Sequence, residues 1–260
     1  MEERTLSQKL LAEFVGTFAL CFVVIGAIAA SAANLQDNGG VVQIAFAYGL
    51  IIAVMVSSVG HVSGGHFNPA VTISAWVTQK IESADALSYI GAQLLGGAAA
   101  ALSLRGLLPG SIWDNVSLGV PAVNGLLSNG QALMIEATLS FFLVWVIFAT
   151  TVDPEGAFGK IAGLAIGLTI AAGVLMGYGF TGAAMNPARH FGPALAGGFW
   201  GDWWIWWVGP IAGGVVAATL YDALILSNRG SGGAAVGEEP HAPHGWGAHG
   251  EDGDATVTNE

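Results

Sequence analysis

Long apolar stretches without a charged residue alternate with short polar segments along most of the chain. They are residues 14–33, 41–60, 86–104, 137–152, 161–180 and 203–221. Five of them approach the roughly 20 residues that a helix needs to cross the hydrocarbon core of a bilayer. The fourth reaches that length only when it is extended back to Gln131, which places Glu136 inside the membrane. The pattern therefore predicts six spanning helices.

The overall composition supports a membrane protein. Hydrophobic residues make up 53% and charged residues 10% of the 260 residues, and the mean hydropathy is +0.63. These values lie outside the range of ordinary soluble domains. Together with the predicted helices they indicate an all-α membrane protein, whose surroundings we expect to be a lipid bilayer and not a nucleic acid.

The acidic charge is concentrated at the C-terminal end. Residues 230–260 carry six carboxylates and no Lys or Arg, so they supply more than half of the net charge of −11. This Gly-rich segment predicts a disordered tail behind a membrane domain at 1–229. The histidines of the segment are His241, His244 and His249. They could bind a metal, but a solvated tail is favoured in the absence of cysteines, so we expect no metal and no cofactor.

Two identical Asn-Pro-Ala triplets interrupt the apolar pattern, 118 positions apart (186 minus 68). They are Asn68-Pro69-Ala70 and Asn186-Pro187-Ala188. Asn is favoured at the N-cap of a helix, and Pro at the first helical position because its missing N–H would have no intrahelical partner there. The apolar run behind each triplet is too short to cross a bilayer of roughly 30 Å at about 1.5 Å per residue. The triplets therefore predict two half-helices.

The triplets belong to a longer internal repeat. Residues 49–53 correspond to residues 167–171 at the same offset of 118, and four of the five residues are identical. The two halves, about 8–108 and about 131–227, each contain three predicted spans. Because three is an odd number, the second half enters the membrane from the opposite face, and we predict an inverted repeat.

Inverted half-helices bring their N-termini together near the membrane midplane, where proteins of this architecture bind their substrates. Each N-terminus carries a partial charge of roughly +0.5, so the centre of the bundle repels cations, including hydronium. If the side-chain carbonyl oxygens of Asn68 and Asn186 cap their own helices, the amide N–H groups are left as donors toward the lumen. A neutral molecule with a hydroxyl oxygen would accept hydrogen bonds from both.

These features resemble the aquaporin, or major intrinsic protein, family over nearly the whole chain up to about residue 227. The motifs that carry the resemblance are Ser63-Gly64-Gly65-His66-Phe67-Asn68-Pro69-Ala70-Val71-Thr72 and Thr181-Gly182-Ala183-Ala184-Met185-Asn186-Pro187-Ala188-Arg189. Their matching positions in the repeat make them specific. The resemblance implies a right-handed bundle of six transmembrane helices plus two re-entrant half-helices, with one pore per subunit of a homotetramer. We further expect a bacterial or archaeal member of the family.

The resemblance also implies which residues line the pore. Main-chain carbonyl groups on the approach to each triplet would replace the hydration of the solute, and four residues further out would form the selectivity filter. The carbonyl groups carried over by position are those of Gly64, Gly65, His66, Gly182, Ala183 and Ala184. The filter residues are Tyr48, Val174, Ala183 and Arg189. None of these residues is expected to be catalytic.

The expected filter departs from that of strictly water-selective members, which carry histidine at the position of Val174. Valine makes the opening wider and more apolar, while Tyr48 keeps an aromatic wall and Arg189 supplies donors and a positive charge that rejects cations. Glycerol-conducting members tend to carry Asp after the arginine, where this chain has His190. The resemblance therefore implies a passive channel for water and small neutral solutes such as ammonia, hydrogen peroxide or glycerol. The alternative is a glycerol or small-polyol facilitator with little preference for water.

Glu13 and Glu136 occupy matching positions in the first and fourth predicted spans. A carboxylate inside a membrane is by default a functional candidate, such as a proton relay. In the family, the matching glutamates accept hydrogen bonds from the backbone of the re-entrant loops, and a symmetric pair suits two symmetric loops, so we favour a structural brace.

Two other classes of protein are alternatives to a passive channel. An ion-coupled secondary transporter would need a titrating carboxylate or a cation site at the midplane, and only the two brace glutamates are available. A membrane enzyme would need a nucleophile, a base and an orienting group, and the predicted spans contain no such cluster. We therefore expect a protein that is not an enzyme.

The Lys and Arg residues predict the orientation. Five of the seven fall on one side of the predicted topology: Arg4, Lys9, Lys80, Lys160 and Arg229. By the positive-inside rule this side is cytoplasmic. Both termini, and the tail with them, are therefore expected on the cytoplasmic side of the plasma membrane.

Overall fold

The computed structural model describes residues 4–33, 40–156 and 161–227; the predicted tail with its three histidines lies outside this part of the chain. Among the described residues, six helices are long and apolar enough to cross a membrane, and no strand occurs. They are α1 (Leu6–Ala33), α2 (Gly40–Ser63), α4 (Ser83–Leu107), α6 (Asn129–Ile147), α7 (Ala162–Thr181) and α9 (Ile205–Tyr221). The prediction of six spans is confirmed.

Short helical segments complete the described part of the fold. They are α5 (Gly110–Asn115), η1 (Ser117–Gly119) and two π-helical turns, η2 (Phe148–Val152) and η4 (Asp222–Leu226). The π turns continue α6 and α9 and lengthen these two spans.

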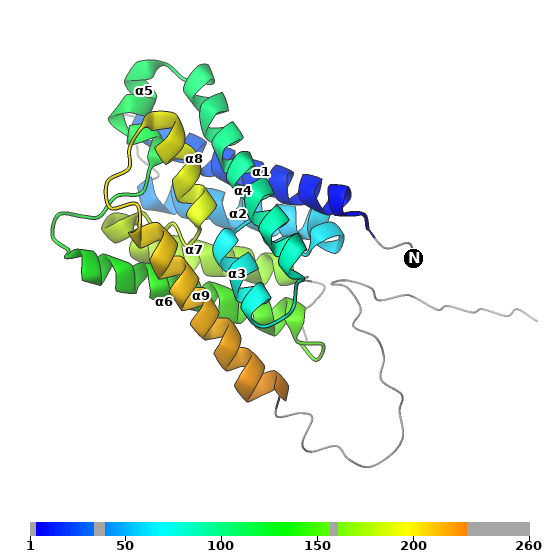
Figure 1. The fold of residues 1–260 in the computed structure, drawn as a ribbon. Coiled ribbons are helices and arrows are strands. Elements are labelled where there is room, and N and C mark those ends of the chain that lie inside the picture. Colours follow the sequence, from blue (N-terminus) through cyan, green and yellow to red (C-terminus); the bar gives the residue numbers. More distant parts are fainter. Residues whose placement is uncertain (1–3, 34–39, 157–160, 228–260) are drawn as a thin grey trace, which may run out of the picture.

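The two triplets begin short helices, as predicted. These are α3 (Pro69–Val77) with 9 residues and α8 (Pro187–Gly197) with 11 residues. The side chain of Asn68 accepts a hydrogen bond from the N–H of Ala70, and the side chain of Asn186 accepts from Ala188 and Arg189. Figure 1 shows α8 above α3, both in front of α2 and α7 in this view. The Asn-Pro pairs therefore act as helix starts through the N-cap.

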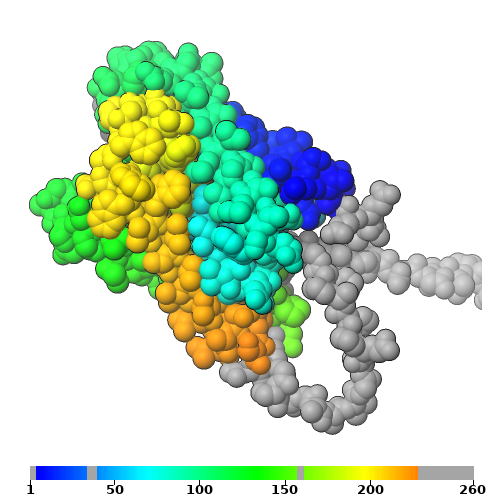
Figure 2. All heavy atoms as spheres, viewed as in Figure 1, coloured from blue at the N-terminus to red at the C-terminus, as the bar shows by residue number. Residues whose placement is uncertain are grey.

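The helices pack according to the repeat. In the first half α1 packs on α4, in the second half α6 packs on α9, and α2 and α7 join the two halves. Each half-helix packs on the last helix of the other half, α3 on α9 and α8 on α4. Figure 2 shows both of these pairs side by side on one face of the molecule. The inverted repeat therefore interlocks its halves.

Glycine permits the closest of these helix contacts. A Cβ atom on Gly49 would lie 2.5 Å from the carbonyl oxygen of Gly167, its counterpart in the repeat. A Cβ atom on Gly97 would lie 2.7 Å from the carbonyl oxygen of Ala188 in α8. Larger residues at these positions would force the helices apart, because real Cβ contacts are never this short. Gly49 thus allows the close approach of α2 to α7, and Gly97 allows that of α4 to α8.

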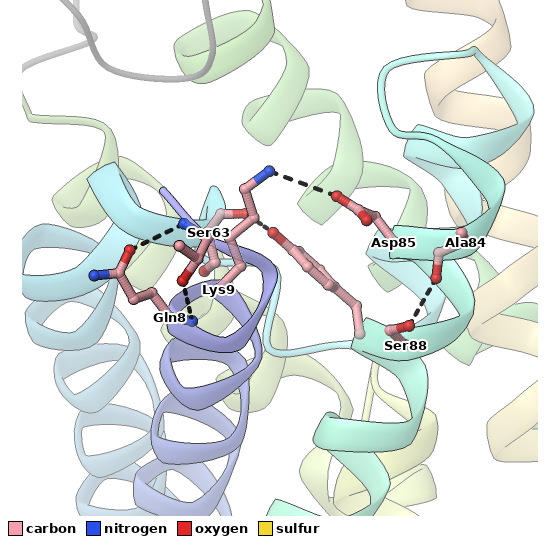
Figure 3. Close-up of polar contacts among 8 residues, drawn as sticks. Gln8, Lys9, Ser63, Ala84, Asp85 and Ser88 are labelled. Atoms are coloured by element: carbon pink, nitrogen blue, oxygen red, sulfur yellow. Dashed lines mark hydrogen bonds and ion pairs between the residues drawn. The ribbon is translucent and has the colours of Figure 1, made fainter. Parts of the chain in front are cut away.

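Polar contacts join three helices at the end of the bundle where α1 begins. Lys9 Nζ of α1 lies 3.5 Å from Asp85 Oδ2 of α4, and Figure 3 shows the Lys9 side chain extended toward Asp85. The Tyr89 hydroxyl of α4 donates a hydrogen bond to the carbonyl oxygen of Ser63, the last residue of α2 (2.9 Å). The ion pair is partly exposed and contributes little to stability, whereas the buried Tyr89 contact positions the loop that leads to α3.

Candidate functional site

The two triplet asparagines are bonded across the centre of the bundle. Asn68 Nδ2 donates to the carbonyl oxygen of Met185 at 2.8 Å, and Asn186 Nδ2 donates to the carbonyl oxygen of Phe67 at 2.9 Å. Both side chains are buried, with 4% and 3% of their surface exposed. Each amide nitrogen has two N–H groups, so one donor per asparagine is used by the opposite loop. We expected both N–H groups of each amide to be free toward the lumen, and this part of the expectation is wrong.

The residues whose carbonyl groups accept these bonds have an unusual backbone. Phe67 and Met185, which are counterparts in the repeat, have φ angles of 50° and 51°. Positive φ is uncommon for a residue with a side chain and costs of order 1–3 kcal/mol. Gly64, Gly65 and Gly182, also at positive φ, lie in the same loops, where glycine adopts this conformation readily. The strained pair directs each carbonyl group at the opposite asparagine.

Glu13 in α1 holds the first loop. Its carboxylate accepts hydrogen bonds from the main-chain N–H groups of His66 (3.0 Å) and Phe67 (2.7 Å). The Ser63 hydroxyl and Gln93 Nε2 also donate to it, each at 2.7 Å. The glutamate is fully buried, and two loop N–H groups that would otherwise lack a partner are satisfied.

Glu136 in α6 holds the second loop in the same way. Its carboxylate accepts from the main-chain N–H groups of Ala184 (3.0 Å) and Met185 (2.8 Å) and from the Thr181 hydroxyl (2.6 Å). It is fully buried as well. The two carboxylates therefore make equivalent contacts in the two halves.

Each of the four expected filter residues is nearly or completely inaccessible to solvent, with at most 2% of its surface exposed. Tyr48 in α2 donates from its hydroxyl to the carbonyl oxygen of Ala184 at 2.6 Å. Arg189 in α8 donates from Nη1 to the carbonyl oxygen of Gly119 at 2.7 Å. Arg189 Nε has no partner among the described residues. Arg189 is therefore held from the connection between α4 and α6, a contact that the sequence does not reveal.

A cavity lies next to the asparagine pair. Asn68 and Asn186 line it together with Tyr48, two of the expected carbonyl-bearing residues of the first loop (Gly65 and His66) and Ala184 of the second. The rest of its wall is apolar and comes from α1, α2, α6 and α7, from Val71 of α3 and from Phe67 and Met185 of the two loops. The other expected residues, Gly64, Val174, Gly182, Ala183 and Arg189, do not line this cavity. A cavity with few polar groups, concentrated at the asparagines, suits small neutral molecules.

Most of the chain matches a known family. The model of the family described as Major intrinsic protein matches residues 1–221. The chain belongs to this family. The resemblance carried by the two triplet motifs is thereby confirmed, and the paired half-helices of the structure are those of a major intrinsic protein.

Individual members are similar over most of their length. Aquaporin TIP4-4 of Zea mays is 41% identical over 229 residues, which cover 86% of this chain and 88% of that protein. Aquaporin-4 of Mus musculus is 43% identical over 215 residues, covering 81% and 65% of the two chains. The X-ray structure of the aquaglyceroporin from Plasmodium falciparum superposes with a TM-score of 0.76 at 26% identity, covering 86% of this chain and 98% of that one. These relatives do not support the expected bacterial or archaeal origin.

Several residues that contribute to this site were not identified from the sequence. Gln93 and Thr72 extend the network around Glu13, and Trp206 donates from Nε1 to the carbonyl oxygen of Thr181 at 3.0 Å. The repeat could have indicated Trp206, because this residue corresponds in sequence to Tyr89 at an offset of 117 (206 minus 89). Gly119 could not be found in this way, since its role depends on a loop conformation.

Proposed function

We propose that the chain forms a passive transmembrane channel for water, which also passes small neutral solutes and excludes protons and ions. The observation that carries the proposal is the pair of hydrogen bonds that joins the N-termini of α3 and α8 through Asn68 and Asn186. Membership in the major intrinsic protein family and the names of the similar aquaporins support it. The solute would pass beside the asparagines.

The asparagine pair supplies a small number of fixed donors. One N–H of each amide is engaged by the opposite loop, so the remaining N–H of each can bind the oxygen of a passing molecule. Two donors that face one oxygen orient a water molecule so that both of its own protons point away. Its hydrogen bonds to the waters before and after it then diverge from the centre, and a proton cannot be relayed straight through.

Electrostatics at the same place opposes cations. The N-termini of α3 and α8 each carry about +0.5 of partial charge. Arg189, which does not line the cavity, adds a full charge, and its Nη1 donates to the carbonyl oxygen of Gly119. Hydronium and metal cations therefore meet repulsion twice along the passage.

Tyr48, Val174, Ala183 and Arg189 are proposed as the selectivity filter, and the choice of solute depends on them. Tyr48 presents an aromatic wall that its bond to Ala184 keeps in place. Val174 and Ala183 are small and offer no polar contact, so the opening admits molecules larger than water. Ammonia, hydrogen peroxide and glycerol are the proposed additional solutes. A glycerol or small-polyol facilitator remains the second candidate, favoured by the apolar Val174 and by the likeness to an aquaglyceroporin structure.

Glu13 and Glu136 are proposed as structural braces. Each carboxylate is saturated by donors of its own half, and neither lines the cavity. A proton relay would need a carboxylate that faces the passage. This arrangement argues against the ion-coupled transporter. Since the described residues of α1 and α6 include no second acid, it also argues against a pair of catalytic carboxylates in these spans.

We also propose the assembly and the orientation. The channel domain comprises residues 1–229, forms a homotetramer in the plasma membrane and has its termini, including the tail at 230–260, in the cytoplasm. Apolar side chains exposed on α2 and α7, such as Phe46, Leu50, Leu164 and Leu168, suit contact with lipid or with a neighbouring subunit.

Stopped-flow light scattering on proteoliposomes tests this function. Water, glycerol, urea and ammonia gradients are compared with empty vesicles, with and without a protonophore. The proposal expects water flux well above that of empty vesicles and unaffected by the protonophore. Strong glycerol flux without water flux would replace it by the facilitator, and flux that collapses with the protonophore would replace it by the transporter.

A further inference from the structure

The two halves brace their loops with equivalent aromatic donors. In the first half the Tyr89 hydroxyl donates to the carbonyl oxygen of Ser63 at 2.9 Å. In the second half Trp206 Nε1 donates to the carbonyl oxygen of Thr181 at 3.0 Å. The residues correspond at offsets of 117 (206 minus 89) and 118 (181 minus 63). The polar residues near Tyr89 therefore also have counterparts near Trp206 at the same offsets.

Thr72 is the polar centre of the first half. Its hydroxyl donates to the carbonyl oxygen of Asn68 at 3.1 Å, and Gln93 Nε2 donates to the hydroxyl at 2.9 Å. The ring nitrogen Nδ1 of His66 lies 3.1 Å from the same oxygen. The Thr72 side chain thus connects the main chain at the start of α3 to the side chains of Gln93 in α4 and His66 in the first loop.

His190 takes the place of Thr72 in the second half, at the offset of 118 (190 minus 72). The counterparts of His66 and Gln93 are Ala184 and Pro210, whose side chains have no hydrogen-bonding group. The side chain of His190 is fully buried, and neither Nδ1 nor Nε2 has a partner among the described residues. The second half therefore has a polar side chain at the position of Thr72 but lacks the neighbouring polar side chains that bind it in the first half.

The imidazole ring is nevertheless firmly placed. It stacks on the ring of Trp206 at a centroid distance of 5.0 Å and an interplanar angle of 9°, and Trp200 meets it edge-on at 6.1 Å. Neither contact satisfies a ring nitrogen. A neutral imidazole has one donor and one acceptor nitrogen, and buried polar groups in native proteins are almost always hydrogen-bonded, to ordered water where no protein group is in reach.

We propose that His190 binds an ordered water molecule through a ring nitrogen, at a site behind the filter in the second half of the bundle only. His190 does not line the cavity beside the asparagines, and its ring packs on Trp206 and Trp200, which are not among the proposed filter residues. The bound water supplies the hydrogen bonding that Gln93 and His66 supply to Thr72 in the first half. The proposal does not depend on which solute the channel passes.

A structure of the full chain, determined at a resolution that orders solvent, tests the proposal. The proposal predicts a solvent peak about 2.7–3.2 Å from Nδ1 or Nε2 of His190. A ring whose two nitrogens contact only carbon atoms would overturn it, and so would a ring that bonds to a protein group or to a metal ion.

Two variants serve as matched controls in the same experiment. His190→Thr rebuilds the first half, because its hydroxyl can donate to the carbonyl oxygen of Asn186 as Thr72 donates to Asn68. His190→Phe keeps a ring on Trp206 but has no nitrogen. Both variants are expected to lack the solvent peak and to conduct water within about twofold of the wild type. A peak that persists in His190→Phe would show that other groups hold the water and would contradict the proposal.

Nitrogen NMR of the histidine-labelled wild type gives a second readout that needs no variant to fold. The proposal expects the His190 ring to show hydrogen-bonded shifts and exchange with deuterated solvent. Ring nitrogens with the shifts of an imidazole free of hydrogen bonds would overturn it.

Discussion

Asn186 Nδ2 donates a hydrogen bond to the carbonyl oxygen of Phe67 at 2.9 Å, which joins residues 119 positions apart (186 minus 67) in the two halves of the repeat. Asn68 makes the equivalent bond to Met185. The starts of the two half-helices are therefore tied to each other and not only to their own helices. The positions of the two side-chain amides therefore depend on this reciprocal pair.

Removing one asparagine tests that dependence. Asn186→Ala deletes the N-cap of α8 and the bond to Phe67, and we expect a loss of about 1 kcal/mol of stability from the cap alone. Water permeability per channel should fall by about tenfold, which corresponds to a barrier to permeation that is higher by ~1.4 kcal/mol. Stopped-flow light scattering measures the flux, with the channel amount in each vesicle preparation quantified.

Asn129→Ala is the matched control for this variant. Asn129 is exposed at the start of α6 and donates to Asp202 at 2.9 Å, so the substitution removes an asparagine hydrogen bond far from the passage. Unchanged flux is expected. If Asn186→Ala also conducts like the wild type, the asparagine pair is not part of the solute path.

Val174→His tests the proposed filter. Histidine narrows the opening and adds a polar contact, so glycerol and ammonia flux should fall by about fivefold or more relative to water flux. Such a ratio corresponds to roughly 1 kcal/mol of discrimination. Val174→Leu, which narrows the opening without a polar group, separates size from polarity. Selectivity that stays the same in both variants would place the constriction elsewhere.

The fold could be predicted from the sequence to a large extent, for physical reasons. Asn68 and Asn186 before proline specify helix starts locally, and the charge-free spans reflect the length of a bilayer crossing. Glu13 and Glu136 could be paired through the repeat. The contacts of Tyr48 with Ala184 and of Arg189 with Gly119 could not, because they join segments 136 and 70 positions apart whose approach depends on the packed bundle.

The amide groups of the asparagines illustrate the same limit. A cap was predicted from the local sequence, and the side-chain oxygens do accept the N–H groups of α3 and α8. The bonds from Nδ2 to the opposite loops depend on the positive φ of Phe67 and Met185. Nothing in an aromatic residue or a methionine indicates such a backbone, since glycine is the residue that favours it.

Glu136→Gln distinguishes a brace from a proton relay. The amide replaces one acceptor oxygen by a donor that faces the N–H group of either Ala184 or Met185, and a buried unsatisfied group costs about 1–3 kcal/mol. Thermal stability in detergent should therefore decrease, while the remaining water flux stays insensitive to a protonophore. The relay would be supported by a different result: a wild type whose flux depends on the proton gradient, and a variant that keeps full stability but loses this dependence.

Mercury provides a positional test of Ala183. In the wild type the cysteine Cys21 is fully buried and does not line the cavity, so mercurials should block water flux only weakly. Ala183→Cys places a thiol at the proposed filter, and flux should then fall by at least about half on addition of mercury and recover with a reducing thiol. Strong block of the wild type would contradict this placement.

The most direct test of the account measures water and proton flux in the same proteoliposomes, by light scattering and by an enclosed pH-sensitive dye. The account predicts water flux far above that of empty vesicles and proton flux equal to that of empty vesicles under an imposed pH gradient. Proton flux that rises with the amount of channel, or water flux no greater than that of empty vesicles, would contradict it.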